Sequence, residues 1–98
     1  MIKILTLNVN TYSTSCGPWP VRIGLIRELL ENTCPDVIAL QAVRREPGQY
    51  QGEDQAEQIS SLTNLYRDIY FQPAMCFPGD VVEGDAILSR LSIIERDY

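Results

Sequence analysis

The sequence predicts a small α/β domain, and three observations indicate this class. Two short segments, residues 2–9 and 36–40, are rich in apolar and β-branched residues. A segment of helical periodicity, residues 22–32, separates them. A strand, a helix and a second strand joined by a crossover of this length form a βαβ unit with parallel strands. A chain of 98 residues holds one modest hydrophobic core, so residues 1–98 are expected to form a single domain.

The first predicted strand, residues 2–9, is apolar in both of its alternating sets of side chains. Ile4 belongs to one set, and Leu5 and Leu7 belong to the other. Apolar groups on both faces are typical of a strand that is covered on both sides. The polar residue Asn8 stands at the carboxyl end of this strand.

The predicted helix over residues 22–32 follows a loop at residues 11–20. One glycine and two prolines in that loop argue against regular structure. Within the helix, isoleucines and leucines recur along one stripe. Pro35 ends the helix, because the residue before a proline disfavours helical backbone angles. The second strand is therefore expected at residues 36–40.

The rest of the chain alternates polar turns with further elements. Residues 44–53 contain a proline and two glycines and predict a loop. Asp54 and Glu57 form an acidic capping box, which predicts the start of a second helix. A third strand is expected at residues 69–77, and Pro73 favours an edge position or a bend for it. Residues 78–84 predict a turn-rich loop. Residues 85–95 predict a fourth strand or two short strands.

Composition excludes several classes of protein. The net charge of −5 argues against a stand-alone nucleic-acid binder, although carboxylates around a metal also make a site locally acidic. The 3 cysteines contain no Cys-x-x-Cys pair, which favours small, partly buried thiols in a reducing cytosol. No apolar run approaches the roughly 18–20 residues that span a bilayer, and no signal-peptide pattern is present. The sequence therefore predicts a cytoplasmic protein without a membrane span.

Polar residues end both predicted parallel strands, and they are the candidate site residues. Asn8 ends the first strand, and Gln41 and Ala42 end the second. Ligands of open α/β sheets lie beyond the carboxyl ends of such strands. Each amide alone is more typical of a sheet-end hydrogen bond than of a ligand. Arg44 follows closely and is a candidate contact to a substrate phosphate. More commonly, two adjacent arginines such as Arg44 and Arg45 are simply exposed to solvent in a loop.

Three blocks of sequence together resemble the endonuclease/exonuclease/phosphatase superfamily, which includes deoxyribonuclease I and abasic-site endonucleases. The blocks are ILTLNV at residues 4–9, PDVIALQ-x-V at 35–43 and GDAILSR at 84–90. Their order and spacing fit, and the resemblance covers nearly the whole chain. It implies the N-terminal half of a four-layer α/β sandwich. It also implies hydrolysis of phosphoester bonds, nucleic acid among the substrates, with Mg²⁺ or Mn²⁺.

The resemblance carries roles for individual positions. Asn8 matches an asparagine at the family's metal and phosphate site. Between Gln41 and Val43 the family has a metal-ligating glutamate, and this sequence has Ala42. Gln41 and Arg44 are then predicted substrate contacts. Asp85 stands where many relatives carry asparagine, and we expect it to be a turn carboxylate rather than a ligand.

The sequence also departs from the family pattern. Relatives are longer, and their second halves supply an Asp-x-Asn motif, further aspartates and a histidine. This sequence contains no histidine and none of those motifs. It therefore predicts part of a metal-dependent phosphoester hydrolase that is inactive as it stands. The alternative is a non-catalytic half-domain for binding or regulation. In either case the strands must be covered, by a homodimer partner or by a second half.

Overall fold

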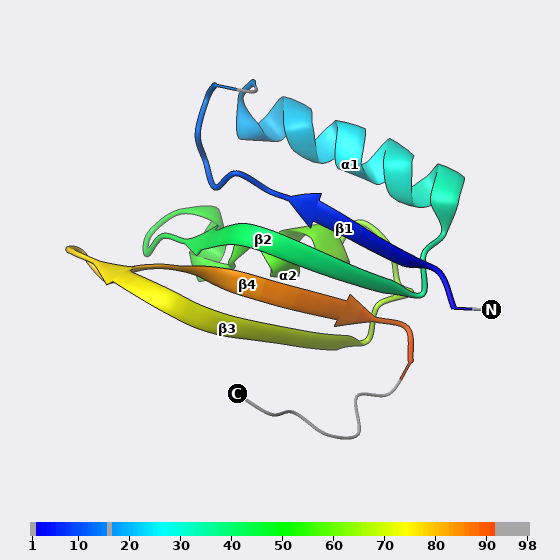
Figure 1. Cartoon of the computed structure of the whole chain (residues 1–98). Helices are drawn as coiled ribbons and strands as arrows, with labels where there is room; N and C mark the ends of the chain where they lie inside the picture. The colour runs from blue at the N-terminus through cyan, green and yellow to red at the C-terminus, as the bar shows by residue number, and fades with distance from the viewer. Residues whose placement is uncertain (1, 16, 92–98) are drawn as a thin grey trace.

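The computed structural model describes residues 2–15 and 17–91, which form one mixed sheet with helices packed on one of its faces (Figure 1). The strands follow the order β1-β2-β4-β3 across the sheet. In the described residues no helix has the length and apolar character needed to cross a membrane. The elements are β1 (Ile4–Asn8), α1 (Trp19–Thr33), β2 (Val37–Arg45), η1 (Tyr50–Gly52), α2 (Gln55–Ser60), β3 (Asp68–Phe77) and β4 (Val81–Ser89).

The predicted βαβ unit is present. β1 and β2 are parallel neighbours, and α1 connects them. β4 then pairs antiparallel with both β2 and β3, so β3 lies at the edge of the sheet. The edge position predicted from Pro73 is confirmed, and the pairing of β3 with β4 is irregular between Pro73 and Met75.

The hydrophobic core lies between the sheet and the two helices. Strand residues alternate, so that one set of side chains faces the helices and the other faces away. On the second face Ile4 is 67% exposed and Ile87 is 42% exposed. The expectation that β1 is covered on both faces is therefore not met within residues 2–15 and 17–91. The buried apolar residues on the covered face are Val9, Trp19, Ile26, Leu30, Ile38, Leu40, Val43, Ala56, Ile59, Tyr66, Ala86 and Leu88.

The first helix begins earlier than its sequence predicts. α1 starts at Trp19, so Pro20 lies in the first turn rather than in a loop. A proline is tolerated there because the amide it lacks would have no partner within the helix. The helix ends at Thr33. The next residue, Cys34, has a left-handed backbone, and its amide donates to the carbonyl of Leu30.

Two strands are longer than expected, and both differences concern candidate residues. β2 continues to Arg45, so Arg44 lies in a strand and the prediction of a loop there was wrong. β4 begins at Val81, so Asp85 lies in a strand and the prediction of a turn carboxylate was also wrong. The end of β2 and the start of β4 both contain charged residues, which is why the sequence predicted loops there. They are strands because these two segments pair with each other across the sheet.

Smaller differences concern the cysteines and α2. Cys34 and Cys76 are exposed, so the prediction that they are partly buried was wrong; Cys16 lies outside the described residues. The second helix begins after Asp54 as predicted but ends at Ser60. Tyr66 lies beyond the end of this helix and is buried, and its hydroxyl donates to the carbonyl of Pro35. The part of the predicted fourth strand after residue 91 also lies outside the described residues.

Candidate functional site at the strand ends

The carboxyl ends of β1 and β2 lie side by side. Asn8 is the register partner of Gln41 in the parallel pair. Beyond it, the amide of Val9 donates to the carbonyl of Gln41 at 2.8 Å, and the amide of Thr11 donates to the carbonyl of Ala42 at 2.9 Å. The structure thus brings the candidate residues Asn8, Gln41 and Ala42 to one place at the end of the sheet.

Ala42 lies in a β-bulge. The pairing of β2 with β4 shifts between Leu40 and Val43, and the φ angle of Ala42 is 56°. A left-handed backbone at a non-glycine residue costs about 1–2 kcal/mol, so surrounding contacts must hold it. Six other described non-glycine residues also have a positive φ, so the strain at Ala42 is compatible with a functional site but does not by itself mark one.

Gln55 of α2 holds the bulge from the core side. Its side chain is fully buried, with 0% of its surface exposed. Its Oε1 accepts from the amide of Arg44 at 3.0 Å, and its Nε2 donates to the carbonyl of Thr11 at 2.7 Å. One amide group therefore ties the segment after β1 to the segment after the bulge. The sequence pattern marked Gln55 only as the first residue of a capped helix, so its role was missed.

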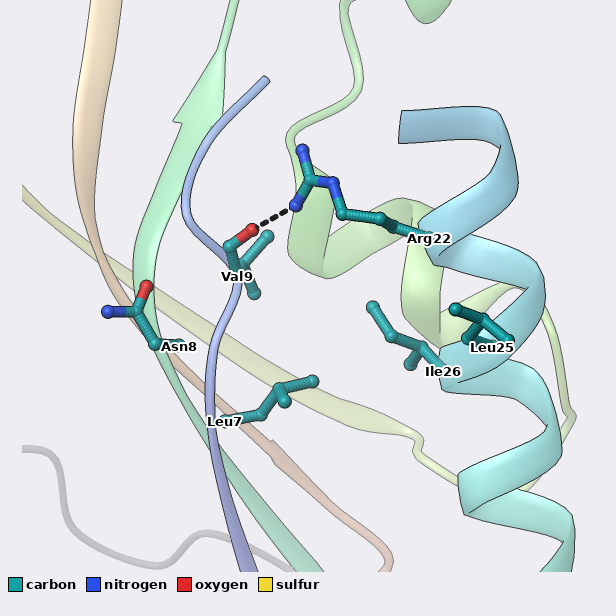
Figure 2. A pocket seen from close by; sticks show the side chains of 6 residues that line it. All are labelled: Leu7, Asn8, Val9, Arg22, Leu25 and Ile26. Atoms are coloured by element: carbon teal, nitrogen blue, oxygen red, sulfur yellow. Dashed lines mark hydrogen bonds between the residues drawn. The ribbon is translucent and has the colours of Figure 1, made fainter. Parts of the chain in front are cut away.

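Asn8 points to the face of the sheet that the helices leave open. In Figure 2 its side chain turns away from α1, whereas Leu7 and Ile26 point toward each other. Its Oδ1 accepts from the amide of Asn10 at 2.9 Å. The cavity of about 220 Å³ between β1 and α1 is mainly apolar, and Asn8 is one of the residues that line it. Figure 2 shows that the amide group of Asn8 nevertheless turns away from α1. That cavity is therefore not the site that the strand ends form.

Arg22 organises the loop that follows Asn8. Its guanidinium donates to the carbonyls of Val9 and Gly17, at 2.5 and 2.8 Å (Figure 2 shows the first bond). It also donates to the carbonyls of Thr11 and Ser13, both at 2.9 Å. The sequence did not reveal this, because a first-turn arginine that folds back over its own loop has the same local pattern as a solvated one.

The other two predicted contacts lie in different surroundings. The Nε2 of Gln41 donates to the carbonyl of Ala39 at 3.3 Å, and the side chain is half-buried beside Asn8. Arg44 instead pairs with Glu83 at 2.9 Å and with Glu46 at 3.5 Å. Two carboxylates therefore neutralise its charge, and the residue is anchored to β4 rather than to the strand ends.

Asn8 and Ala42 alone do not fit a divalent cation. Hard cations take oxygen ligands, and Mg²⁺ sites in proteins include one or two carboxylates. Here the pair offers one amide oxygen, which already accepts a hydrogen bond, and a methyl group. Within residues 2–15 and 17–91 no three His, Cys, Asp or Glu side chains are grouped as metal ligands.

The capping box of α2 adds a titratable group near these strand ends. The amide of Glu57 donates to Oδ1 of Asp54 at 2.8 Å, and the amide of Asp54 donates to Oε1 of Glu57 at 3.0 Å. The predicted capping box is confirmed. Asp54 is buried, and mainly this burial raises its pKa from 3.8 to about 6.

Asp54 is expected to make the stability of the domain depend on pH. Between about pH 4 and 6 the folded state binds more protons at this carboxyl than the unfolded state does. Its contribution to the free energy of unfolding therefore falls as the pH rises through this window and is constant above it. Asp54→Asn keeps an N-cap acceptor and should remove this slope. Urea unfolding of both proteins from pH 4 to 7.5 measures the difference, and parallel curves would contradict the assignment.

Comparisons with known proteins support the fold. No family model matches the sequence, and no curated protein does. An endonuclease/exonuclease/phosphatase from Beutenbergia cavernae matches 97% of this chain with a TM-score of 0.73 and 22% identity. An endonuclease/exonuclease/phosphatase family protein from Leptotrichia buccalis matches 99% with a TM-score of 0.73 and 20% identity. The chain spans only 27% and 41% of these two proteins. The predicted α/β fold, as part of a larger fold of that kind, is therefore confirmed.

Proposed function

We propose that this chain is the N-terminal part of a divalent-metal-dependent phosphoester hydrolase, inactive as it stands because position 42 lacks a carboxylate. The observation that carries the proposal is the end of the parallel pair. Asn8 lies against Gln41, and the next residue, Ala42, is held in a left-handed bulge. This arrangement occurs in a fold shared with two endonuclease/exonuclease/phosphatase proteins.

The chemistry of phosphoester cleavage explains why the chain is proposed to be inactive. A bound divalent cation would stabilise the charge that develops on the phosphate oxygens. Such catalysis depends on positioned charge, and removing one stabilising group already lowers the rate strongly. The amides of Asn8 and Gln41 remain able to hydrogen-bond a phosphoester. Ala42 offers no ligand, and Arg44 is paired with Glu83 and Glu46.

Ala42→Glu is expected to raise the affinity for Mg²⁺ or Mn²⁺ at least tenfold, measured by isothermal titration calorimetry. The reason is that the new carboxylate would stand beside the amide of Asn8 at the strand end. Ala42→Gln is the matched control, because it has nearly the same shape, the same backbone strain and no charge. Equal affinities of the two variants would contradict the proposal.

A non-catalytic half-domain is the second candidate, and the open sheet face favours it. Ile4 and Ile87 are 67% and 42% exposed on that face, and apolar side chains of this size are normally covered. If Ala42→Glu gains no affinity and the wild-type chain sediments as a dimer, this second candidate replaces the first.

A further inference from the structure

The segment between β2 and α2, residues 47–52, is a strap that stays at the surface. Figure 1 shows it as the loop that leaves the end of β2 and returns at the start of α2. All of its residues are exposed, and the short helix η1 within it buries none of them. In the described part of the chain, the hydrogen bonds of these residues all stay within residues 46–53, so none of them ties the strap to another element.

One aromatic ring connects the strap to the segment that follows β1. The rings of Tyr50 and Tyr12 are stacked, with centroids 5.3 Å apart and planes 14° apart. Tyr12 itself is held in place, because its ring meets that of Trp19 edge to face at 5.9 Å and its hydroxyl accepts from Nε2 of Gln58 at 2.9 Å. It directly follows Thr11, whose amide donates to the bulge of β2. Tyr50 therefore covers a fixed ring beside the strand ends.

The closed strap has a strained backbone at the residue that carries this ring. Tyr50 and Gln51 are both left-handed, with φ angles of 48° and 58°. Such a conformation is costly for any residue except glycine, and only surrounding contacts maintain it. Because the hydrogen bonds of the strap are local, the stack of Tyr50 on Tyr12 is the contact that offsets the strain. One aromatic stack and two strained residues contribute free energies of similar size, so the closed form is only weakly favoured.

Glycines on both sides of the strained pair allow the strap to move. Gly48 and Gly52 have φ angles of 79° and 77°, a region that glycine occupies without steric cost. A Cβ at either position would meet no atom of the described residues within 4 Å. Both glycines can therefore change their backbone angles without displacing a neighbour, as hinge residues must.

We infer that residues 47–52 form a hinged strap that the stack of Tyr50 on Tyr12 holds closed. In the closed form the ring of Tyr50 covers one face of Tyr12. In the open form the strained residues relax, and that face becomes accessible beside the ends of β1 and β2. The strap thus regulates access to the segment after β1, and this inference does not depend on the role proposed for position 42.

The test is ¹⁵N relaxation of the whole chain. In the wild type we expect relaxation dispersion at the amides of residues 49–52, because the open form is a minor state that exchanges in microseconds to milliseconds. Tyr50→Ala should leave the strap open, with order parameters below about 0.6 at those amides. Tyr50→Phe keeps the ring and should behave as the wild type does. Gln51→Gly relieves one strained residue and should lower the ratio of open to closed form about fivefold.

Gln49→Ala is the matched control, because Gln49 is an exposed strap residue whose side chain makes no hydrogen bond to any described residue. It should leave the dispersion and the order parameters unchanged. A strap that stays ordered in Tyr50→Ala would overturn the inference, and so would a wild type without dispersion at these amides. If Tyr50→Ala unfolded the whole domain, the ring would belong to the core rather than to a hinged strap, and the inference would again be wrong.

Discussion

Arg22→Ala is expected to lower the free energy of unfolding by about 3–4 kcal/mol and to loosen the loop that follows Asn8. Hydrogen bonds to charged groups contribute about 1.5–3 kcal/mol each, and Arg22 donates to four carbonyls. The total loss is smaller than their sum, because carbonyls in a surface loop regain water. Urea unfolding measures the free energy, and hydrogen exchange of the Thr11 and Ser13 amides reports the loop.

Arg27→Ala provides the control for this prediction. Arg27 lies on the same helix, and within residues 2–15 and 17–91 it pairs only with Glu31, at 3.2 Å, with both side chains 59% exposed. Exposed pairs of this kind contribute about 0.3–0.5 kcal/mol. Arg22→Lys should recover little, because an ammonium group cannot present the planar fork of donors that reaches several carbonyls at once. If the losses for Arg22→Ala and Arg27→Ala were alike, the organising role of Arg22 would be refuted.

Gly84→Ala is expected to lower the free energy of unfolding by about 2–3 kcal/mol, because it forces β3 and β4 apart. A Cβ at this position would lie 2.0 Å from the carbonyl oxygen of Gln72 and 2.9 Å from the Cα of Pro73. These are backbone atoms of the neighbouring strand, so no side chain can rotate away to make room. Urea unfolding, together with hydrogen exchange of the β3 amides, measures the effect.

Gly24→Ala is the matched control, and its effect should have the opposite sign. Gly24 lies on α1, and a Cβ there would meet no atom of the described residues within 4 Å. Alanine in an exposed helical position is favoured over glycine by about 0.5–1 kcal/mol, so the variant should gain stability. An unchanged stability of Gly84→Ala would show that β3 shifts without cost and that its approach to β4 is not tight.

Local patterns in the sequence were sufficient for the parts of the fold that depend on near neighbours. The parallel βαβ pair followed from two apolar segments around a helix of fixed length. The capping box at Asp54 followed from residues three apart, and the edge position of β3 followed from one proline that cannot donate in a ladder. The place of Asn8 at the end of β1 followed in the same way, because strand ends are set by local composition.

The other features of the site depend on pairing between strands that are far apart in the sequence. No local sequence pattern reveals that pairing. The bulge at Ala42 exists because β2 and β4, far apart in the chain, pair with a one-residue offset. The same pairing places Asp85 in a strand and joins Arg44 to Glu83. The register between distant strands and the partner of a long side chain depend on contacts formed only when the chain has folded. The sequence therefore predicted that Asn8 and Gln41 end neighbouring parallel strands, and the folded sheet determined which other side chains lie beside them.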